Sequence, residues 1–227
     1  MIALRAGCVR LSGRAVLHDI DFRAQAGEVV ALCGPNGAGK STLLRALAGL
    51  LPGGVPPDPR HLGFLPQGAR CAWGMTVAEV VALGRIPHGD ADPAPVARAI
   101  AACGLDGLRA ARVDRISGGQ ARRAMLARVL ATEPEVMLLD EPTADLDPAA
   151  AHEIMALLRE LARQGRCVLV VLHALDLATR YADRIVVMAD GRIVADAPPA
   201  DALPRAAAVF GLPWGSDPAP RLLPPAP

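Results

Sequence analysis

The chain has 227 residues, of which 52% are hydrophobic and 21% are charged. The length is enough for one large domain or for a domain with a small inserted lobe, and the composition argues for a well-buried core and against a disordered chain. The 24 basic residues almost match the 23 acidic ones, so the chain lacks the basic excess of a protein that binds nucleic acid through many phosphates. The five cysteines include no CxxC pair, which argues against a disulfide framework or a zinc site.

The sequence also carries no signal for a membrane or an export pathway. No apolar run approaches the ~18 residues that are needed to cross a bilayer, and Val168–Leu172 is typical of the longest runs. The N-terminus lacks the charged lead, long apolar stretch and cleavage site of a secretory signal. We therefore expect a protein of the cytosol.

Short runs rich in Val, Ile and Leu alternate with longer helical stretches, a pattern typical of a mainly parallel sheet covered by helices. The predicted strands are residues 16–22, 28–33, 61–65, 136–139, 167–172, 184–188 and 192–195. The predicted helices are residues 39–50, 77–84, 95–103, 118–131 and 148–164. We expect the first two strands to pair as an antiparallel edge, and the last two likewise through a turn at Asp190-Gly191.

The order of these elements predicts an inserted lobe and a tail. Residues 68–131 contain predicted helices but no convincing strand, which indicates a helical subdomain inserted into an α/β core formed by residues 1–67 and 132–212. Residues 213–227 are rich in proline, and we predict a flexible tail there.

A glycine-rich loop matches the phosphate-binding pattern GxxxxGK[ST], between an apolar strand and a helix. Its residues are Gly34, Pro35, Asn36, Gly37, Ala38, Gly39, Lys40 and Ser41, with Thr42 following as a further nucleotide contact. Glycines let the backbone N–H groups surround a polyphosphate, and the helix N-terminus adds its positive end. Lys40 is the only lysine in the chain; it can reach the β- and γ-phosphates, and the Ser41 hydroxyl can ligate Mg²⁺.

Two carboxylates follow the apolar strand 136–139. In folds of this kind, acids at the carboxyl end of a parallel strand lie beside the phosphate loop. Asp140 is therefore predicted to hold hydrated Mg²⁺, and Glu141 to act as a general base or to position water at the γ-phosphate. Together with the loop, these residues predict a site that binds and hydrolyses a nucleoside triphosphate.

Three further features have an ordinary interpretation when each is taken alone. Ser117 caps a helix that opens with Gly118, Gly119 and Gln120. Gln67 leaves a strand, as many polar loop residues do, and His173 follows another strand, where a histidine can contact a γ-phosphate but is more often a surface residue.

In this order the motifs resemble the ATP-binding subunit of an ABC transporter, over roughly residues 4–212. The corresponding parts are the phosphate loop, Gln67 as the glutamine loop, residues 116–120 as the signature, Asp140-Glu141 as the end of Walker B, residues 144–147 as the D-loop, and His173 as the switch histidine. The resemblance implies a P-loop (RecA-like) α/β fold: a mainly parallel sheet with an antiparallel β edge and an inserted helical subdomain.

The resemblance also implies that the protein works with partners. In the family, ATP lies between the phosphate loop of one copy and the signature of a second copy. Ser117, Gly118, Gly119 and Gln120 would thus bind ATP in trans, and Asp147 would communicate between the two sites. Glu141, Gln67 and His173 would be the catalytic residues, with Gln67 also contacting Mg²⁺. The helical lobe would bind membrane permease subunits, which would hold the protein on the inner face of the cell membrane, and a periplasmic substrate-binding protein would deliver the substrate.

Two stretches point to the transported substrate. Residues 80–88, and residues 172–178 with 181–184, resemble ATPases of metal-chelate importers for ferric siderophores, haem and cobalamin. An ABC ATPase for another solute, in either direction, is the alternative; a non-transport ABC protein is disfavoured by the neutral charge and the single nucleotide domain. His88, within the first stretch, is predicted to be structural rather than a metal ligand.

The sequence departs from the family pattern at three places, one of which is the stretch between Leu51 and Gln67, which is shorter than usual and predicts a trimmed antiparallel β region. At the position of Leu11 the family often has an aromatic ring that stacks on adenine. A leucine there lacks this stacking interaction, which is worth about 1 kcal/mol. In the signature, Ile116 replaces the usual Leu and Ala121 replaces a polar or basic residue. Arg122 and Arg123 remain available for polar contacts from that helix.

Overall fold

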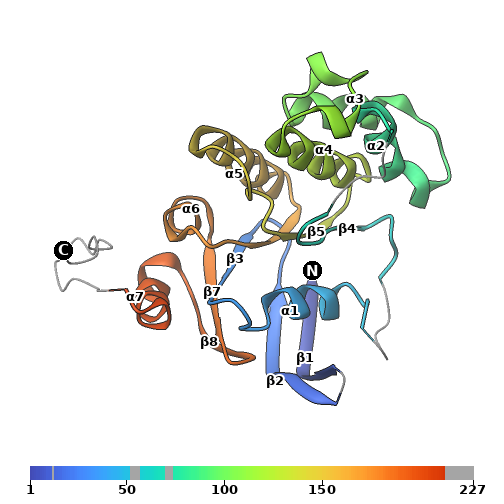
Figure 1. Cartoon of the computed structure of the whole chain (residues 1–227). Coiled ribbons are helices and arrows are strands. Elements are labelled where there is room, and N and C mark those ends of the chain that lie inside the picture. The colour runs from blue at the N-terminus through green and yellow to red at the C-terminus, as the bar shows by residue number, and fades with distance from the viewer. Residues whose placement is uncertain (12, 52–56, 70–73, 213–227) are drawn as a thin grey trace.

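Two sheets form the framework of the computed structural model, which describes residues 1–11, 13–51, 57–69 and 74–212 (Figure 1). The eight strands of these residues are β1 (Ile2–Leu11), β2 (Arg14–Ala24), β3 (Val29–Cys33), β4 (Leu62–Leu65), β5 (Val136–Asp140), β6 (Cys167–Val171), β7 (Arg184–Ala189) and β8 (Arg192–Ala197). β1 and β2 form an antiparallel pair, and the larger sheet has the order β4-β5-β6-β3-β7-β8.

Helices fill most of the connections between strands. The α-helices are α1 (Lys40–Leu47), α2 (Val77–Ala82), α3 (Pro93–Ala102), α4 (Gly118–Ala131), α5 (Pro148–Arg163), α6 (Leu175–Tyr181) and α7 (Pro199–Phe210). Three 3₁₀ helices accompany them: η1 (Leu83–His88), η2 (Asp106–Leu108) and η3 (Val113–Arg115). None of the helices in the described ranges combines the length and apolar character that a bilayer crossing requires.

The first five strands of the larger sheet are parallel, and their registers bring their carboxyl ends to one edge. Leu65 of β4 pairs with Leu139 of β5, which pairs in turn with Val170 of β6. On the other side of β6, Val171 pairs with Leu32 of β3. The loops that leave β4, β5, β6 and β3 therefore begin side by side, which is where such sheets bind ligands.

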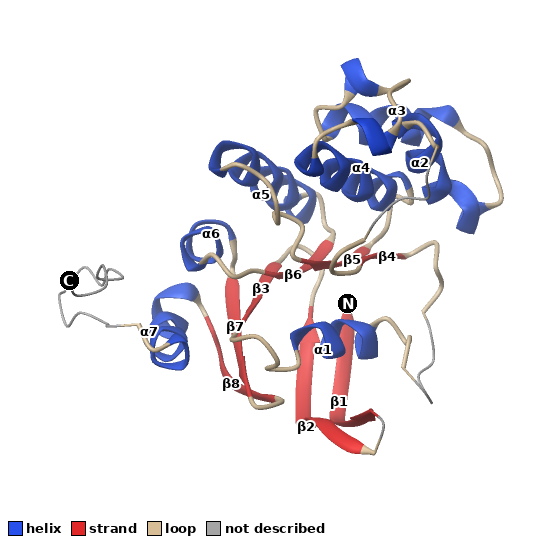
Figure 2. Cartoon of the chain, viewed as in Figure 1, coloured by secondary structure: helices blue, strands red, loops and turns tan. Residues whose placement is uncertain are grey.

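Side chains of the sheet alternate between two buried layers, because successive residues of a strand point to opposite faces. On one face, Leu32, Leu138 and Leu169 belong to the apolar cluster that includes α1 and β2. On the other face, Leu139 and Val170 pack in the cluster that includes α5, α6, α7 and the helices of residues 77–131. Helix α1, which follows the phosphate loop, is thus held between the two sheets (Figure 2).

The predicted helical lobe contains α2, α3 and α4, which pack on one another beyond the β4 edge (Figure 1). Between residues 74 and 131 the only strand-like pairing is an isolated bridge from Thr76 to Arg112. Capping boxes begin two of the helices: Thr76 with Glu79 at α2, and Ser117 with Gln120 at α4. The sequence thus sets these helix starts locally.

The predicted pairing of the first two strands is wrong. β2 pairs instead with β1, a strand that the sequence analysis did not predict, and β3 lies between β6 and β7 in the larger sheet. All five side chains of β3 are buried, as expected of a central parallel strand. The pairing of β7 with β8 is confirmed, with Asp190 and Gly191 both at positive φ in the turn. Helices α6 and α7 were not predicted, and the predicted tail lies outside the described residues.

Candidate nucleotide site

The phosphate loop runs from β3 into α1 in a conformation that needs glycine. Gly34 has φ +148 and Gly39 has φ +100, values that side chains rarely tolerate. A Cβ atom at Gly34 would meet the Met188 carbonyl oxygen, and one at Gly39 would lie 2.8 Å from Leu17 Cδ2. Gly39 precedes α1 without a capping side chain, so the backbone N–H groups of this helix end remain available to an anion.

The Lys40 side chain folds back over its own loop. Its ammonium donates hydrogen bonds to the Gly34 oxygen at 2.7 Å and the Pro35 oxygen at 2.8 Å. Burial lowers the pKa of Lys40, while the carboxylates of Glu141 and Asp140 oppose that shift. A phosphate in the loop would offer this buried ammonium a charged acceptor in place of two neutral carbonyls, which is a stronger interaction.

Asp140 ends β5 as a buried carboxylate with one oxygen unpaired. The residue is 2% exposed, and its Oδ1 atom has no hydrogen-bond partner among the residues that the structure describes. Burial raises the pKa of Asp140, and a hydrogen bond from the Ser41 hydroxyl partly lowers it. An unpaired carboxylate oxygen next to a hydroxyl suits Mg²⁺, which binds few protein oxygens and completes its shell with water and phosphate. Accordingly, the described residues hold no group of three or more His, Cys, Asp or Glu side chains that could bind a metal by themselves.

Glu141 accepts hydrogen bonds from both of the other predicted catalytic residues. Its Oε1 atom lies 2.9 Å from Gln67 Nε2 and 2.7 Å from His173 Nε2. These side chains leave the carboxyl ends of three neighbouring strands: Gln67 follows β4, Glu141 follows β5 and His173 follows β6. The structure therefore brings Gln67, Glu141 and His173 together, and their roles in hydrolysis stay predictions.

Arg122 joins this group from the signature helix. Its guanidinium donates to the backbone carbonyls of Asp140 and Glu141. The sequence analysis named Arg122 only as an available polar residue. Its burial could have been predicted from helical periodicity, because Met125, Leu126 and Val129 lie three, four and seven positions later on the same apolar face. The neighbouring Arg123 instead pairs with Glu153 at 2.9 Å.

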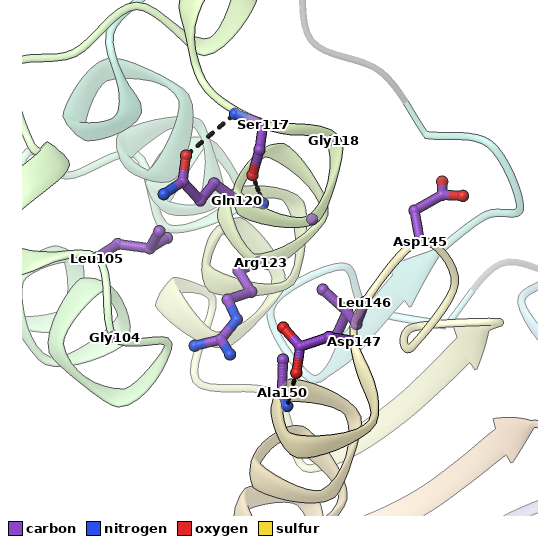
Figure 3. Close-up of a pocket in the computed structure, with 11 residues that line it drawn as sticks. Gly104, Leu105, Ser117, Gly118, Gln120, Arg123, Asp145, Leu146, Asp147 and Ala150 are labelled. Carbon is purple, nitrogen blue, oxygen red and sulfur yellow. Dashed lines mark hydrogen bonds between the residues drawn. The ribbon is translucent and has the colours of Figure 1, made fainter.

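The predicted signature residues line a separate pocket of about 700 Å³ (Figure 3). Ser117 and Gln120 form the capping box at the start of α4. Ser117 Oγ accepts a hydrogen bond from Gln120 N at 3.2 Å, and Gln120 Oε1 accepts one from Ser117 N at 3.0 Å. Across the pocket, Asp147 caps α5 through the Ala150 N–H at 2.9 Å. Gly118 and Gly119 also line the pocket, whereas the phosphate loop contributes nothing to it.

Leu11, the predicted adenine contact, is the last residue of β1. It pairs with Arg14 at the start of β2 and is half-buried. Thr42 lies one residue beyond Ser41 in the first turn of α1, also half-buried. Contact of either residue with a nucleotide stays a prediction.

Known proteins resemble this chain in sequence and in fold. A family model described as ABC transporter matches residues 17–144. The hemin import ATP-binding protein HmuV of Rhodococcus jostii is 42% identical over 224 residues, covering 89% of this chain and 77% of that protein. The protein of the same name from Streptomyces coelicolor is 43% identical over 213 residues, covering 85% and 76%.

Two solved structures superpose on most of the chain. One is described as the ATP binding subunit of an ABC transporter, with a TM-score of 0.79, 26% identity, and coverage of 92% of this chain and 93% of that one. The other is the dimeric structure of a bacterial ABC transporter cassette, with a TM-score of 0.78, 25% identity, and coverage of 87% and 98%.

Replacing the only lysine tests the phosphate loop. Lys40→Ala removes the buried ammonium, and we expect ATP affinity to fall about 10-fold to 100-fold, the worth of a hydrogen bond to a charged group. Titration with a fluorescent ATP analogue measures this. Arg45→Ala, an exposed position on the same helix, is the matched control and should bind normally. Unaltered affinity in Lys40→Ala would remove Lys40 from the site.

Replacing Asp140 tests the metal site. Asp140→Asn keeps the shape of the side chain but removes the charge that attracts a divalent cation. We expect Mg²⁺ to strengthen binding of the ATP analogue in the unmodified protein and to have less than about half of that effect on log affinity in the variant. Asp176→Asn, exposed at the start of α6, should behave like the unmodified protein. A full Mg²⁺ effect in Asp140→Asn would contradict the assignment.

Proposed function

The chain belongs to the ABC transporter family as a subunit that binds and hydrolyses ATP, and on this premise we propose that it powers the import of a metal chelate such as haem. The observation that carries the proposal is its 42% identity, over 89% of the chain, to a hemin import ATP-binding protein. Residues 80–88, with their likeness to metal-chelate importers, support the same substrate class.

The geometry at the carboxyl edge of the sheet supports one division of labour for hydrolysis. Lys40 and the backbone of the phosphate loop bind the β- and γ-phosphates, and Ser41 and Asp140 hold Mg²⁺. Mg²⁺ supplies charge neutralisation on the phosphate oxygens when it is bound. Glu141 positions or deprotonates the attacking water, with Gln67 and His173, both within 2.9 Å of its Oε1 atom, orienting its carboxylate.

We further infer that two copies of the chain enclose ATP between them. The signature pocket opens at the N-terminus of α4, where backbone N–H groups favour an anion. The phosphate loop of the same copy does not line this pocket, so a phosphate held by both motifs requires a second copy. The similar bacterial cassette was solved as a dimer.

A groove between η1 and β4 is the proposed contact with the membrane permease. It has a volume of about 390 Å³ and is lined by both elements, including Phe64 and Ile86. Ile86 is 68% exposed, so the groove presents a large apolar side chain that a partner could cover. Docking there would hold the protein on the inner face of the cell membrane, and import would also require a periplasmic substrate-binding protein.

The segment that carries Ile86 is fixed firmly to the end of α4. The buried Arg85 donates to the Ala131 oxygen at 3.0 Å and pairs with Asp90 at 2.6 Å. Thr132 Oγ1 donates to the Gly84 oxygen at 3.0 Å, and His88 Nε2 donates to the Thr132 oxygen at 2.9 Å. His88 is thus engaged with backbone, in keeping with the structural role predicted for it, and Ile86 projects from a rigid base.

Uptake into vesicles tests the function directly. Membrane vesicles that contain the cognate permease, its substrate-binding protein and this protein should accumulate haem only with ATP. Glu141→Gln should keep ATP binding but slow hydrolysis about 10²-fold or more, the usual contribution of a positioned base, and uptake should slow with it. Accumulation of an unrelated solute, with none of haem or another metal chelate, would refute the substrate; near-normal turnover in Glu141→Gln would refute the role of Glu141.

A charge in the groove tests the permease contact. Ile86→Glu would bury an unpaired carboxylate against the partner, so we expect co-purification with the permease to fall about 10-fold or more. Leu50→Glu adds the same charge at a position that is 58% exposed and lies outside the groove, and it should leave the complex intact. Equal recovery of both variants with the permease would argue for a different docking surface.

A further inference from the structure

Arg122 is a buried cation whose hydrogen bonds go to backbone rather than to a carboxylate. It is 7% exposed, and burial lowers its pKa. Other arginines of the lobe pair with acids: Arg85 with Asp90, Arg112 with Asp114, and Arg123 with Glu153. Burying an arginine costs free energy unless specific partners compensate for it, so the partners that Arg122 does have are informative.

Those partners are two successive carbonyls. Nη2 donates to the Asp140 oxygen and, at 2.6 Å, to the Glu141 oxygen, which also accepts from Nε at 3.2 Å. These oxygens belong to the two peptide units that flank the Glu141 Cα atom. A planar guanidinium that holds both units fixes the rotations between them, and these rotations are the φ and ψ of Glu141.

The conformation fixed in this way is an uncommon one. Glu141 has φ +53, in the left-handed region that a long side chain rarely adopts. The backbone there directs the Glu141 carboxylate to Gln67 and His173. Relaxation of φ to a common value would swing the Cα–Cβ bond and carry the carboxylate away from both.

We propose that Arg122 is a positioning residue, which holds the Glu141 turn in its left-handed conformation and ties it to the signature helix. Arg122 lies in the second turn of α4, whose first turn carries the signature residues Ser117 to Gln120. The helix that would touch ATP of the opposite site is therefore fastened to the catalytic turn of its own site. This inference rests on the role proposed above for Glu141.

Two substitutions in the full-length protein separate positioning from folding. Arg122→Lys keeps the charge and Arg122→Gln keeps a donor, but neither can bridge both carbonyls as a planar fork does. We expect kcat to fall about 10-fold to 100-fold, the scale of a misplacement of about 1 Å, with KM and ATP affinity within about 2-fold of normal. Arg109→Gln, an exposed arginine of the lobe that pairs with Asp106, is the control and should leave kcat unchanged.

A double-mutant cycle tests whether Arg122 acts through Glu141. Glu141→Gln alone should lower turnover strongly, and adding Arg122→Lys should lower it no further, because the two changes remove one function. Independent losses that multiply would overturn the inference. So would a normal kcat in Arg122→Lys, a loss of ATP affinity as large as the loss of kcat, or failure of both Arg122 variants to fold.

The same cycle distinguishes this inference from the proposal on which it rests. If Glu141→Gln retains its turnover, the role of Glu141 fails and the inference fails with it. If Glu141→Gln is inactive while Arg122→Lys turns over normally, the role of Glu141 stands and only the inference about Arg122 is overturned.

Discussion

The proposed catalytic side chains meet at one atom, the Oε1 oxygen of Glu141. This oxygen accepts hydrogen bonds from two side chains that follow two other strands. Gln67 and His173 reach it only because β4, β5 and β6 are neighbours in register and end at one edge. The phosphate loop follows β3, the next strand along. Four consecutive loops of one parallel edge thus supply the part of the site that one copy contributes around the phosphate loop, and a shift of any strand would remove one of its parts.

The partners of the buried charged side chains indicate which of them are suited to bind a ligand and which stabilise the fold. Lys40, Asp140 and Arg122 are each less than a tenth exposed, as is Arg85 in the lobe. Arg85 is neutralised by carboxylates and its place is structural. The Lys40 ammonium donates its hydrogen bonds to neutral backbone carbonyls, and the Oδ1 oxygen of Asp140 is unpaired among the described residues. Both arrangements are costly without a ligand and favourable once an anion and a cation are present together.

The sequence predicted what depends on local pattern and missed what depends on packing. The loop before Lys40, the capped start of α4 and the β7–β8 turn were recognisable because a few adjacent residues determine each of them. The register of β1 with β2 is irregular around Gly7, so the alternation that predicts a strand is obscured there. Pro204 lies within α7, and because a proline argues against a helix, the sequence did not predict this one. The contact of Arg122 with the Glu141 turn joins residues distant in sequence, so helical spacing could indicate that Arg122 is buried but not what it binds.

Helix α4 connects the proposed functions along a single element. Its N-terminus carries the proposed signature, Arg122 in its second turn donates to the backbone of the Glu141 turn, and its C-terminus is hydrogen-bonded to η1 beside the proposed permease groove. A hydrogen-bonded helix transmits displacement with little internal deformation, so movement at one end reaches the other. ATP in the signature pocket and a permease in the groove would each bias the position of this helix. The Glu141 turn, fastened to it between those two contacts, is then placed to make hydrolysis depend on both.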